Sequence, residues 1–367
     1  MWSDSERRAM GRAIEEAKRG RPSPNPRVGA ALVRDGEIAA LGYHHKAGEA
    51  HAEVDAIRNA GEPVDGTTLY VTLEPCNHHG RTGPCTEAII TAGIARVVIG
   101  CRDPAPHVPG AIDRLEGAGV KVDVGLLEGE CEALVADFTK HVKTGLPFVT
   151  LKAAVTLDGK IATRTGHSKW ITGRTARTEA HRLRDESDAI LVGVGTVLVD
   201  NPQLTVRHVE GRNPLRVVVD ADLRTPTNAA VLGPHGKLDQ GTVIFCARDA
   251  DASRLQPLVR PGVEIIRVAR HARGVDMLEV LKKLAARDVV RLLVEGGAHV
   301  NGTFLDLGLA DRAAIFIAPQ ILGDATAPSF AAGAGAETIE RAWRVVRSEL
   351  RPVGSDWLLT GDLERME

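Results

Sequence analysis

The sequence predicts two α/β domains in one chain, at residues 1–146 and 147–367. A chain of 367 residues is too long for one ordinary core, since domains hold roughly 100–200 residues. Apolar segments typical of strands alternate with helical segments along both halves, which is the pattern of an α/β protein. Gly145 and Pro147 interrupt this pattern, and a new β-rich stretch follows them. We therefore place the domain boundary near residue 146.

The first half predicts one helix, then two strands, then strand-and-helix units. Residues 1–20 form an amphipathic pattern that a Ser/Asp cap starts and Gly20 stops. Strands are expected at 28–36 and 37–44, joined by an Asp35-Gly36 turn. A helix is expected to begin near His51. Strands at 67–73 and 95–100 are each followed by a helix, at 85–93 and 110–119.

A helical segment at 127–145 leads into the second half, which alternates again. Its first β-rich stretch is residues 146–163, and a helix is expected at 275–288. The other apolar, strand-like segments are 188–198, 214–224, 241–247, 263–269, 289–297 and 312–323. No repeat relates the two halves, so we expect two different domains without a long disordered linker.

Composition and charge exclude several classes of protein. Hydrophobic residues make up 43% and charged residues 26%, and no apolar run reaches the roughly 18–20 residues of a membrane span. The N-terminus lacks the apolar block of a signal peptide. Five scattered cysteines suit a reducing compartment, so we expect a cytoplasmic location. A net charge of −2 offers no general attraction for nucleic acid, and small-molecule chemistry is the better hypothesis.

Residues 51–85 hold a candidate zinc site made by His51, Cys76 and Cys85. Imidazole and thiolates suit zinc, and a catalytic zinc usually has three protein ligands and one open position for water. His51 and Glu53 can serve one site only if a helix begins there, because residues two apart on a regular helix point to different sides. Glu53 would then exchange protons beside the metal as a general acid/base.

A closed structural zinc site with His78 or His79 as a fourth ligand is the main alternative, and unpaired thiols in a core are another. Glu53 favours catalysis, because His51-Ala52-Glu53 together with Pro75-Cys76 matches the H-x-E and P-C motif of zinc nucleobase deaminases. The second cysteine departs from that motif, since eight residues separate Cys76 from Cys85 where two are usual.

The second half contains glycine-rich turns but no complete dinucleotide-binding motif. Gly193 and Gly195 follow an apolar strand, but position 198 is leucine, so G-x-G-x-x-G fails. Gly296-Gly297 lies between a strand and a helix, where backbone N–H groups can face a phosphate. The guanidinium groups of Arg184 and Arg207 also suit a phosphate, although ordinary ion pairing is the simpler explanation.

Seven segments occur in the order found in one enzyme family: NPRVGA, GYHHKAGEAHAE, VTLEPCNHHGRTGPC, TLDGK, SKWIT, DAILVGVGTVLVDNPQLTVR and VEGGA. The chain resembles the bifunctional riboflavin-biosynthesis deaminase/reductases over essentially its whole length. The long interval between the two cysteines is typical of this family and differs from cytidine and tRNA-adenosine deaminases.

For residues 1–146 the resemblance implies a cytidine-deaminase-like α/β/α domain. This domain removes the 2-amino group of a diaminopyrimidinone bearing a phosphoribosylamino group, with zinc held by His51, Cys76 and Cys85 and with Glu53 moving protons. Asn25 and His44 match positions near the pyrimidine, although a turn-forming Asn and a structural His are equally good readings. Arg81 would help to bind the phosphate. One departure from the family is Ala105, which stands in "DPAPHVPGA" where Asn is usual.

For residues 147–367 the resemblance implies a dihydrofolate-reductase-like α/β domain that uses NADPH to reduce the ribosyl group to ribityl. The positions matching cofactor contacts are Ala154, Trp170, Thr172, Thr196, Asp200, Gly296 and Gly297. Those matching substrate contacts are Ser168, Arg184, Leu204, Arg207 and Glu295. Lys152 and Asp158 would contact sugar hydroxyls or hold the strand end, and Trp170 would pack on the nicotinamide or fill a core.

The resemblance further implies a homo-oligomer. Two alternatives remain at this stage, namely a deaminase of free or tRNA-borne nucleobases fused to an unrelated reductase, and a non-catalytic zinc module that binds ligands or partners.

Overall fold

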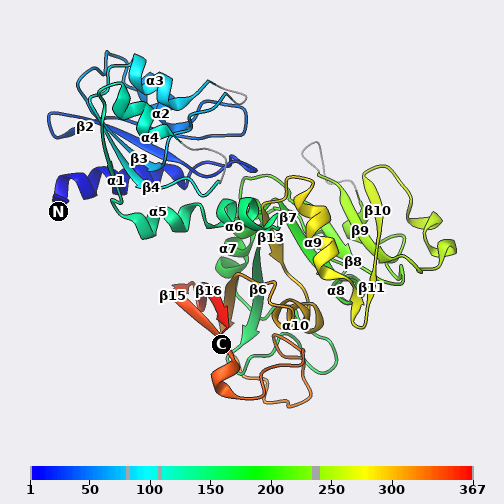
Figure 1. Ribbon diagram of the computed structural model, residues 1–367. Coiled ribbons are helices and arrows are strands. Elements are labelled where there is room, and N and C mark those ends of the chain that lie inside the picture. Colours follow the sequence, from blue (N-terminus) through cyan, green and yellow to red (C-terminus); the bar gives the residue numbers. More distant parts are fainter. Residues whose placement is uncertain (1, 80–82, 106–109, 234–239, 366–367) are drawn as a thin grey trace. The chain divides into compact units, whose positions relative to one another are not determined.

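The computed structural model describes residues 2–79, 83–105, 110–233 and 240–365. The chain divides into two compact units, Met1–Leu146 and Pro147–Glu367 (Figure 1). Arg81 and residues 106–109 of the altered "DPAPHVPGA" segment lie outside the described residues.

Unit 1 is built on a five-stranded sheet with the strand order β2-β1-β3-β4-β5. β1 pairs antiparallel with β2 and β3, whereas β3, β4 and β5 are parallel. The expected turn at Asp35-Gly36 joins β1 to β2. The strands are β1 (Gly29–Arg34), β2 (Glu37–Tyr43), β3 (Thr68–Leu73), β4 (Arg96–Cys101) and β5 (Lys121–Val124), of which β5 was not expected.

Helices cover both faces of this sheet, giving the three-layer α/β/α arrangement that the sequence predicts. Along β1, Ala30 and Leu32 pack into one core cluster and Ala31 into another, because successive strand residues point to opposite faces. The first cluster includes residues of α2, α3 and α4, and the second includes residues of α1 and α5. These helices are α1 (Asp4–Ala17), α2 (Ala52–Asn59), α3 (Cys85–Thr91), α4 (Ala111–Gly117) and α5 (Glu128–Leu134).

The sequence predicts the start of α1 correctly but misses a break in the helical segment 127–145. Ser3 caps α1 in a reciprocal capping box with Glu6, as the Ser/Asp start predicts. The helix expected over 127–145 is instead two helices, α5 and α6 (Ala136–Thr144), which meet at Val135. Val135 has φ −109° and ψ 12°, which are outside the helical range and break the helix there.

Unit 2 is built on a nine-stranded sheet with the order β10-β9-β8-β7-β13-β6-β14-β16-β15. Neighbours from β10 to β14 are parallel, while β16 and β15 form an antiparallel edge. The strands are β6 (Phe148–Thr156), β7 (Ala189–Gly193), β8 (Leu215–Val219), β9 (Thr242–Ala247), β10 (Val263–Val268), β13 (Arg291–Val294), β14 (Arg312–Ala318), β15 (Trp343–Val353) and β16 (Asp356–Arg365).

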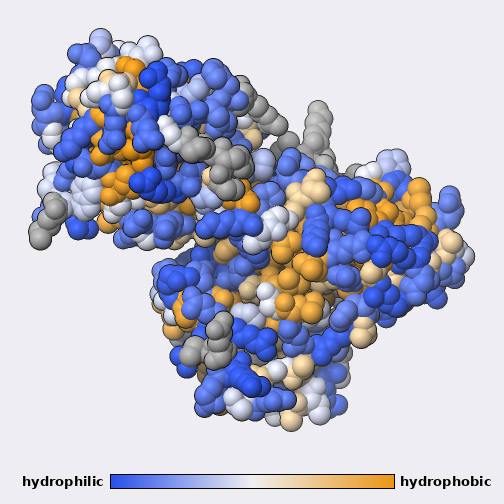
Figure 2. Space-filling model, in the orientation of Figure 1, coloured by the Kyte–Doolittle hydropathy of each residue, from blue (hydrophilic) through white to orange (hydrophobic). Residues whose placement is uncertain are grey.

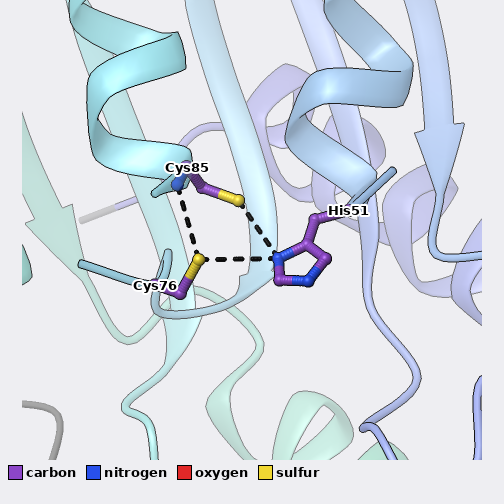
Figure 3. Close-up of side chains that lie close together, drawn as sticks. All are labelled: His51, Cys76 and Cys85. Atoms are coloured by element: carbon purple, nitrogen blue, oxygen red, sulfur yellow. Dashed lines mark hydrogen bonds between the residues drawn. The ribbon is translucent and has the colours of Figure 1, made fainter. Parts of the chain in front are cut away.

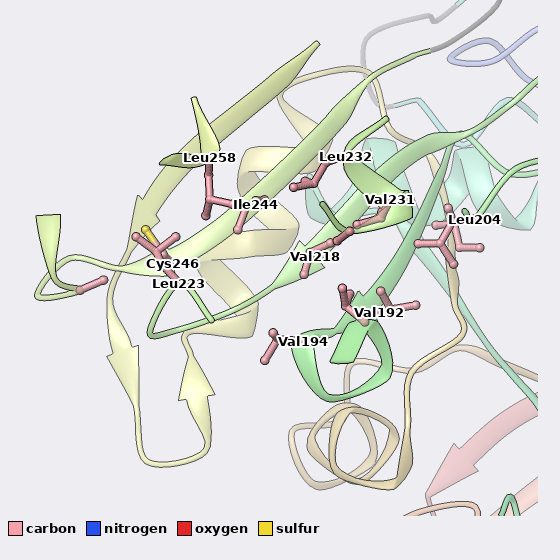
Figure 4. Packing of buried hydrophobic residues seen from close by; sticks show 14 of the residues in the cluster. Val192, Val194, Leu204, Val218, Leu223, Val231, Leu232, Ile244, Cys246 and Leu258 are labelled. Atoms are coloured by element: carbon pink, nitrogen blue, oxygen red, sulfur yellow. The ribbon is translucent and has the colours of Figure 1, made fainter. Parts of the chain in front are cut away.

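In the described part of unit 2, four α-helices and a small hairpin accompany the large sheet. The helices are α7 (Arg174–Asp185), α8 (Val194–Asp200), α9 (Met277–Ala285) and α10 (Ala298–Asp306), and the hairpin is β11 (Arg270–His271) with β12 (Gly274–Val275). Short 3-10 turns are η1 (Ala230–Leu232), η2 (Ala252–Arg254), η3 (Gln256–Leu258) and η4 (Ile339–Arg341). One core cluster joins β7, β8 and β9 to the segments after them, with Val192, Val218 and Ile244 among its members (Figure 4).

On the face shown in Figure 2 the surface is mostly hydrophilic, and hydrophobic residues form limited patches within each unit. In the described ranges of the chain, every helix is too short or too polar to cross a membrane.

Candidate functional site

Three potential metal ligands converge in unit 1. His51 precedes the first turn of α2, Cys76 lies just after β3, and Cys85 is the first residue of α3. His51 Nδ1 lies 3.2 Å from Cys85 Sγ and 3.5 Å from Cys76 Sγ, and the Cys85 backbone N–H donates to Cys76 Sγ at 3.4 Å (Figure 3). All three ligand atoms lie within 4.8 Å of one another. The cluster therefore has the size and the donor chemistry of a zinc site.

The placement of α2 depends on a close approach to β2. A Cβ atom added at Gly42 would lie 2.2 Å from Ala56 N and 2.6 Å from Ala52 O, so only glycine lets the helix pack there. His51 is the N-cap residue of α2, and Glu53 lies in its first turn. The helix thus begins where the sequence requires, which brings His51 and Glu53 into one site.

The pKa values of the two thiols are shifted in opposite directions. Hydrogen bonding with the Cys85 thiol and with His51 lowers the pKa of Cys76 to about 4, while the Cys76 thiolate and burial raise the pKa of Cys85. A divalent cation would remove this conflict, because it favours deprotonation of both thiols. His78 and His79 are exposed, and neither belongs to the cluster among the described residues. The donor set therefore fits a three-ligand site better than a closed four-ligand one.

Glu53 is buried beside this cluster. Glu53 is 2% exposed as a residue, and its Oε2 has no hydrogen-bond partner among the described residues. Burial raises the pKa of Glu53, although the nearby His51 opposes this shift. A buried carboxylate oxygen without a hydrogen-bond partner is costly unless a ligand uses it. Its position suits a group that accepts and returns a proton next to the metal ligands.

Asn25 and His44 form a hydrogen-bonded pair next to His51. Asn25 Nδ2 donates to His44 Nε2 at 3.0 Å, and His44 Nδ1 donates to Ala50 O at 2.9 Å. Burial lowers the pKa of His44, which favours the neutral ring that this pattern requires. The rings of His44 and His51 meet edge to face, with centroids 4.9 Å apart. Both nitrogens of His44 are thus engaged, and the Asn25 carbonyl oxygen is left for other contacts.

A cavity of about 1120 Å³ adjoins the cluster. Its lining includes His51, His45, Arg58 and His79. His79 therefore lines the pocket wall instead of joining the three metal ligands.

Unit 2 contains a cavity of about 650 Å³ along the carboxyl ends of its parallel strands, where ligands bind in open α/β sheets. Every residue matched to a cofactor or substrate contact in unit 2 lines this cavity, whereas Asp158 does not. They are Ala154, Ser168, Trp170, Thr172, Arg184, Thr196, Asp200, Leu204, Arg207, Glu295, Gly296 and Gly297.

Glu295 anchors a buried charge cluster in this cavity. Arg184 donates to both of its carboxylate oxygens, at 2.7 and 2.9 Å, and Lys152 Nζ lies 3.4 Å away. Although burial alone would raise the pKa of Glu295, Arg184 and Lys152 hold it well below its usual range. Arg184 also donates to Thr205 O at 3.0 Å. Three of the five N–H donors of its guanidinium are therefore engaged by the protein.

Arg207 is the more available cation. Its guanidinium donates to Gln203 Oε1 at 3.0 Å and to Thr205 Oγ1 at 2.6 Å, which are neutral acceptors. Its backbone N–H donates to Nδ1 of the buried His181 at 2.9 Å. Burial, with help from nearby arginines, lowers the pKa of His181 to about 3, so this ring stays neutral near pH 7.

The residues expected to contact the cofactor lie around the turns after β7 and β13. Ser168 Oγ donates to Asp200 Oδ1 at 3.0 Å. Trp170 is 67% exposed, with the Arg177 guanidinium 4.4 Å above its ring, so it does not fill a core. A Cβ atom added at Gly297 would meet only Thr196 Oγ1, at 3.6 Å, so the backbone there is open to a ligand. These features fit a dinucleotide lying on the Gly296-Gly297 turn.

Asp158 holds the end of β6. It accepts hydrogen bonds from the Gly323 N–H at 2.9 Å and the Leu322 N–H at 3.1 Å, and from Thr156 Oγ1. These bonds lower its pKa to about 2. Asp158 thus holds the strand end, which is one of the two roles that the sequence analysis considered for it.

The sequence did not single out Arg177, His181 and His208, which also line the cavity in unit 2. The first two lie on α7, whose strongly polar sequence hid its buried face. The repeated small residues Ala176 and Ala180, four apart and both buried, were the available signal.

Comparisons with known proteins agree with both halves of the structure. Residues 147–359 match the RibD C-terminal domain family, and residues 3–101 match the zinc-binding region of cytidine and deoxycytidylate deaminases. The riboflavin biosynthesis protein RibD of Aquifex aeolicus is 41% identical over 349 residues, covering 95% of each chain. That of Escherichia coli is 41% identical over 364 residues, covering 95% of this chain and 96% of its own.

Solved structures show the same likeness. The diaminohydroxyphosphoribosylaminopyrimidine deaminase/5-amino-6-(5-phosphoribosylamino)uracil reductase of Thermotoga maritima has a TM-score of 0.82 and 39% identity over 98% of both chains. RibD of Acinetobacter baumannii has a TM-score of 0.84 and 33% identity, over 98% of this chain and 99% of its own. A match to one reductase family over most of unit 2 rules out an unrelated reductase. The chain belongs to the RibD family of bifunctional riboflavin-biosynthesis enzymes, with a zinc-binding deaminase domain and an NADPH-using reductase domain.

Proposed function

We propose that the chain acts on 2,5-diamino-6-(5-phosphoribosylamino)pyrimidin-4(3H)-one in two steps. Residues 1–146 replace the 2-amino group by oxygen, consuming water and releasing ammonia. Residues 147–367 then reduce the ribosyl group to ribityl. The observation that carries the proposal is the meeting of His51, Cys76 and Cys85 with the buried carboxylate of Glu53, whose Oε2 has no hydrogen-bond partner among the described residues.

In the first step, His51, Cys76 and Cys85 would hold zinc, which supplies an activated water when bound. Glu53 would move protons between the attacking water and the substrate, so that the C–O bond forms first and the amine, given a proton, then leaves as ammonia. Asn25, held by His44, presents its carbonyl oxygen to the pyrimidine. His44 acts in this proposal as a positioning residue, because both of its nitrogens are already engaged.

In the second step, NADPH supplies the hydride that reaches C1′ of the ribose. Ala154, Trp170, Thr172, Thr196, Asp200 and the Gly296-Gly297 turn would hold the cofactor. On the substrate side we assign Ser168, Leu204, Arg207, Arg184 and Glu295. Arg207 binds the substrate phosphate, because its hydrogen-bond partners are neutral. Arg184 and Glu295 shape and stabilise the wall of this site.

The proposal is tested with purified full-length protein, the diaminopyrimidine ribotide and NADPH. We expect one ammonia released and one NADPH oxidised for each substrate consumed. Removing zinc with a chelator should stop ammonia release, while reduction of substrate that is already deaminated continues. Absence of ammonia from the zinc-loaded protein would overturn the assignment of the first step. If chelation also stops reduction of the deaminated substrate, the two sites are not independent as proposed.

We further propose that the enzyme is a cytoplasmic homo-oligomer. All five cysteines are free thiols, which supports a reducing compartment. The edge strand β15 is 11 residues long, its Leu350 is 61% exposed, and Trp357 on the adjacent β16 is 40% exposed. Exposed edge strands favour pairing with another chain. Light scattering of the purified protein should give the mass of at least two chains, and a monomer at micromolar concentration would contradict this proposal.

A further inference from the structure

A second cavity in unit 2 continues from the first. It has a volume of about 1010 Å³, and five residues line both cavities, namely Ile161, Ser168, Thr196, Asp200 and Gly297. From these shared residues it reaches the segments that follow β7 and β8. A ligand lying on the turn at Gly297 can therefore extend from one cavity into the other.

Three arginines line the part of the second cavity that the first does not share. Arg270 is held by two carboxylates, with Nη2 2.9 Å from Asp222 Oδ1 and Nε 2.9 Å from Asp249 Oδ1. Arg273 is paired with Asp306. The third is Arg224, and no carboxylate in the described parts of the chain forms an ion pair with it. Arg224 is therefore the arginine whose charge is available to an anionic ligand.

The turn after β8 fixes the backbone on both sides of Arg224. Asp220 is fully buried, and its Oδ2 accepts from both the N–H and the Oγ1 of Thr225 at 2.7 Å. Leu223, with φ of +52°, packs in the core cluster that includes Cys246 (Figure 4). Arg224 lies between these two anchored residues and is itself exposed. The backbone of Arg224 is therefore held next to the cavity.

The location matches the adenosine end of a dinucleotide. In doubly wound nucleotide-binding domains, the strand beside the glycine-rich turn carries the groups that meet the adenosine ribose. A carboxylate there binds the 2′-hydroxyl of NADH, and an arginine accommodates the 2′-phosphate of NADPH. Here β8 is the neighbour of β7, whose following turn, with Gly193 and Gly195, lines the same cavity as Gly297. Asp222 and Arg224 follow β8 and also line this cavity. Asp222 is already engaged by Arg270, which leaves Arg224 as the group that discriminates.

We propose that Arg224 binds the 2′-phosphate of NADPH and gives this reductase its preference for NADPH over NADH. The inference rests on the cofactor role proposed above for the Gly296-Gly297 turn. A guanidinium binds phosphate through two parallel hydrogen bonds, whereas a 2′-hydroxyl offers no charge to neutralise. Loss of Arg224 should thus weaken the binding of NADPH and leave that of NADH almost unchanged.

Calorimetric titration of the full-length protein tests this without turnover. The probes are 2′,5′-ADP, which carries the 2′-phosphate, and 5′-AMP, which lacks it, followed by NADP⁺ and NAD⁺. We expect the wild type to bind 2′,5′-ADP at least tenfold more tightly than 5′-AMP. R224A should lose about 10- to 100-fold in affinity for 2′,5′-ADP and NADP⁺, as expected for hydrogen bonds to a charged group. Its affinity for 5′-AMP and NAD⁺ should stay within about twofold of wild type.

R344A is the matched control, since Arg344 is an exposed arginine on β15 that lines none of the three cavities. R224K should recover part of the affinity, because lysine keeps the charge but not the planar fork. The inference fails if R224A weakens both members of a probe pair equally or neither of them. If the wild type binds neither NADP⁺ nor NAD⁺, the cofactor role itself fails. If it binds both equally, only the inference about Arg224 fails.

Discussion

The buried carboxylate of Glu295 offers the sharpest test of how the reductase site is held together. Glu295, Arg184 and Lys152 are each between 10% and 14% exposed, so their charges are poorly screened by solvent. E295Q keeps the size of the side chain but leaves two cations without a counter-charge. Breaking a buried ion pair in this way costs about 3–5 kcal/mol. This is a large part of the roughly 5–15 kcal/mol that stabilises a typical domain.

Urea unfolding followed by tryptophan fluorescence measures the effect, since three of the four tryptophans lie in unit 2. With a slope of about 1–3 kcal/mol per molar urea, the midpoint for E295Q should fall by at least about 1 M. E349Q is the matched control, because Glu349 is exposed on β15, and it should change the free energy of unfolding by less than about 0.5 kcal/mol.

A double-mutant cycle identifies the cause. R184M removes one of the two cations that E295Q leaves unpaired, so the double variant should lose at least about 1 kcal/mol less than the sum of the single variants. A loss below about 1 kcal/mol for E295Q would refute this reasoning. Strict additivity of the two substitutions would also refute it, because the two side chains would then not be coupled.

Two further predictions concern the same unit. The pKa of His181 is about 3 when folded and near 6.5 when unfolded, so the unfolded state binds more protons between these values and stability falls as pH drops through that window. Between pH 7.5 and pH 5, the free energy of unfolding should fall by about 2 kcal/mol less for H181N than for wild type. An equal fall in both proteins would contradict this. G296A places a Cβ 2.6 Å from that of Val300, so it should cost about 1–3 kcal/mol in urea unfolding, and V300A should recover part of this. If G296A is as stable as wild type, the turn can accommodate a Cβ atom and the prediction is wrong.

Local patterns in the sequence predict much of the fold. The capping box at Ser3, the turn at Asp35-Gly36 and the start of α2 at His51 depend on neighbouring residues, and the structure confirms each of them. The potential metal ligands were found in the same way, because their residue types and the adjacent Glu53 form a motif that the structure brings together.

Features that depend on distant partners were missed. The hairpin of β15 and β16 mixes exposed, half-buried and buried residues, so its pattern did not resemble a buried strand, and only pairing with β14 defines its place. Arg184 and Glu295 are 111 residues apart, and nothing local shows that they bind each other. The sequence therefore suggested Arg184 as a phosphate ligand but not its pairing with Glu295.

The central claim is that Glu53 performs deamination beside zinc and plays no part in the reduction. The most direct measurement compares E53Q with wild type for ammonia release, for zinc content, and for NADPH oxidation with substrate that is already deaminated. E37Q is the control, because Glu37 is exposed at the start of β2. We predict that E53Q keeps its zinc and its reductase activity but releases ammonia at least about 100-fold more slowly. Ammonia release within tenfold of wild type, or loss of zinc from E53Q, would contradict the account.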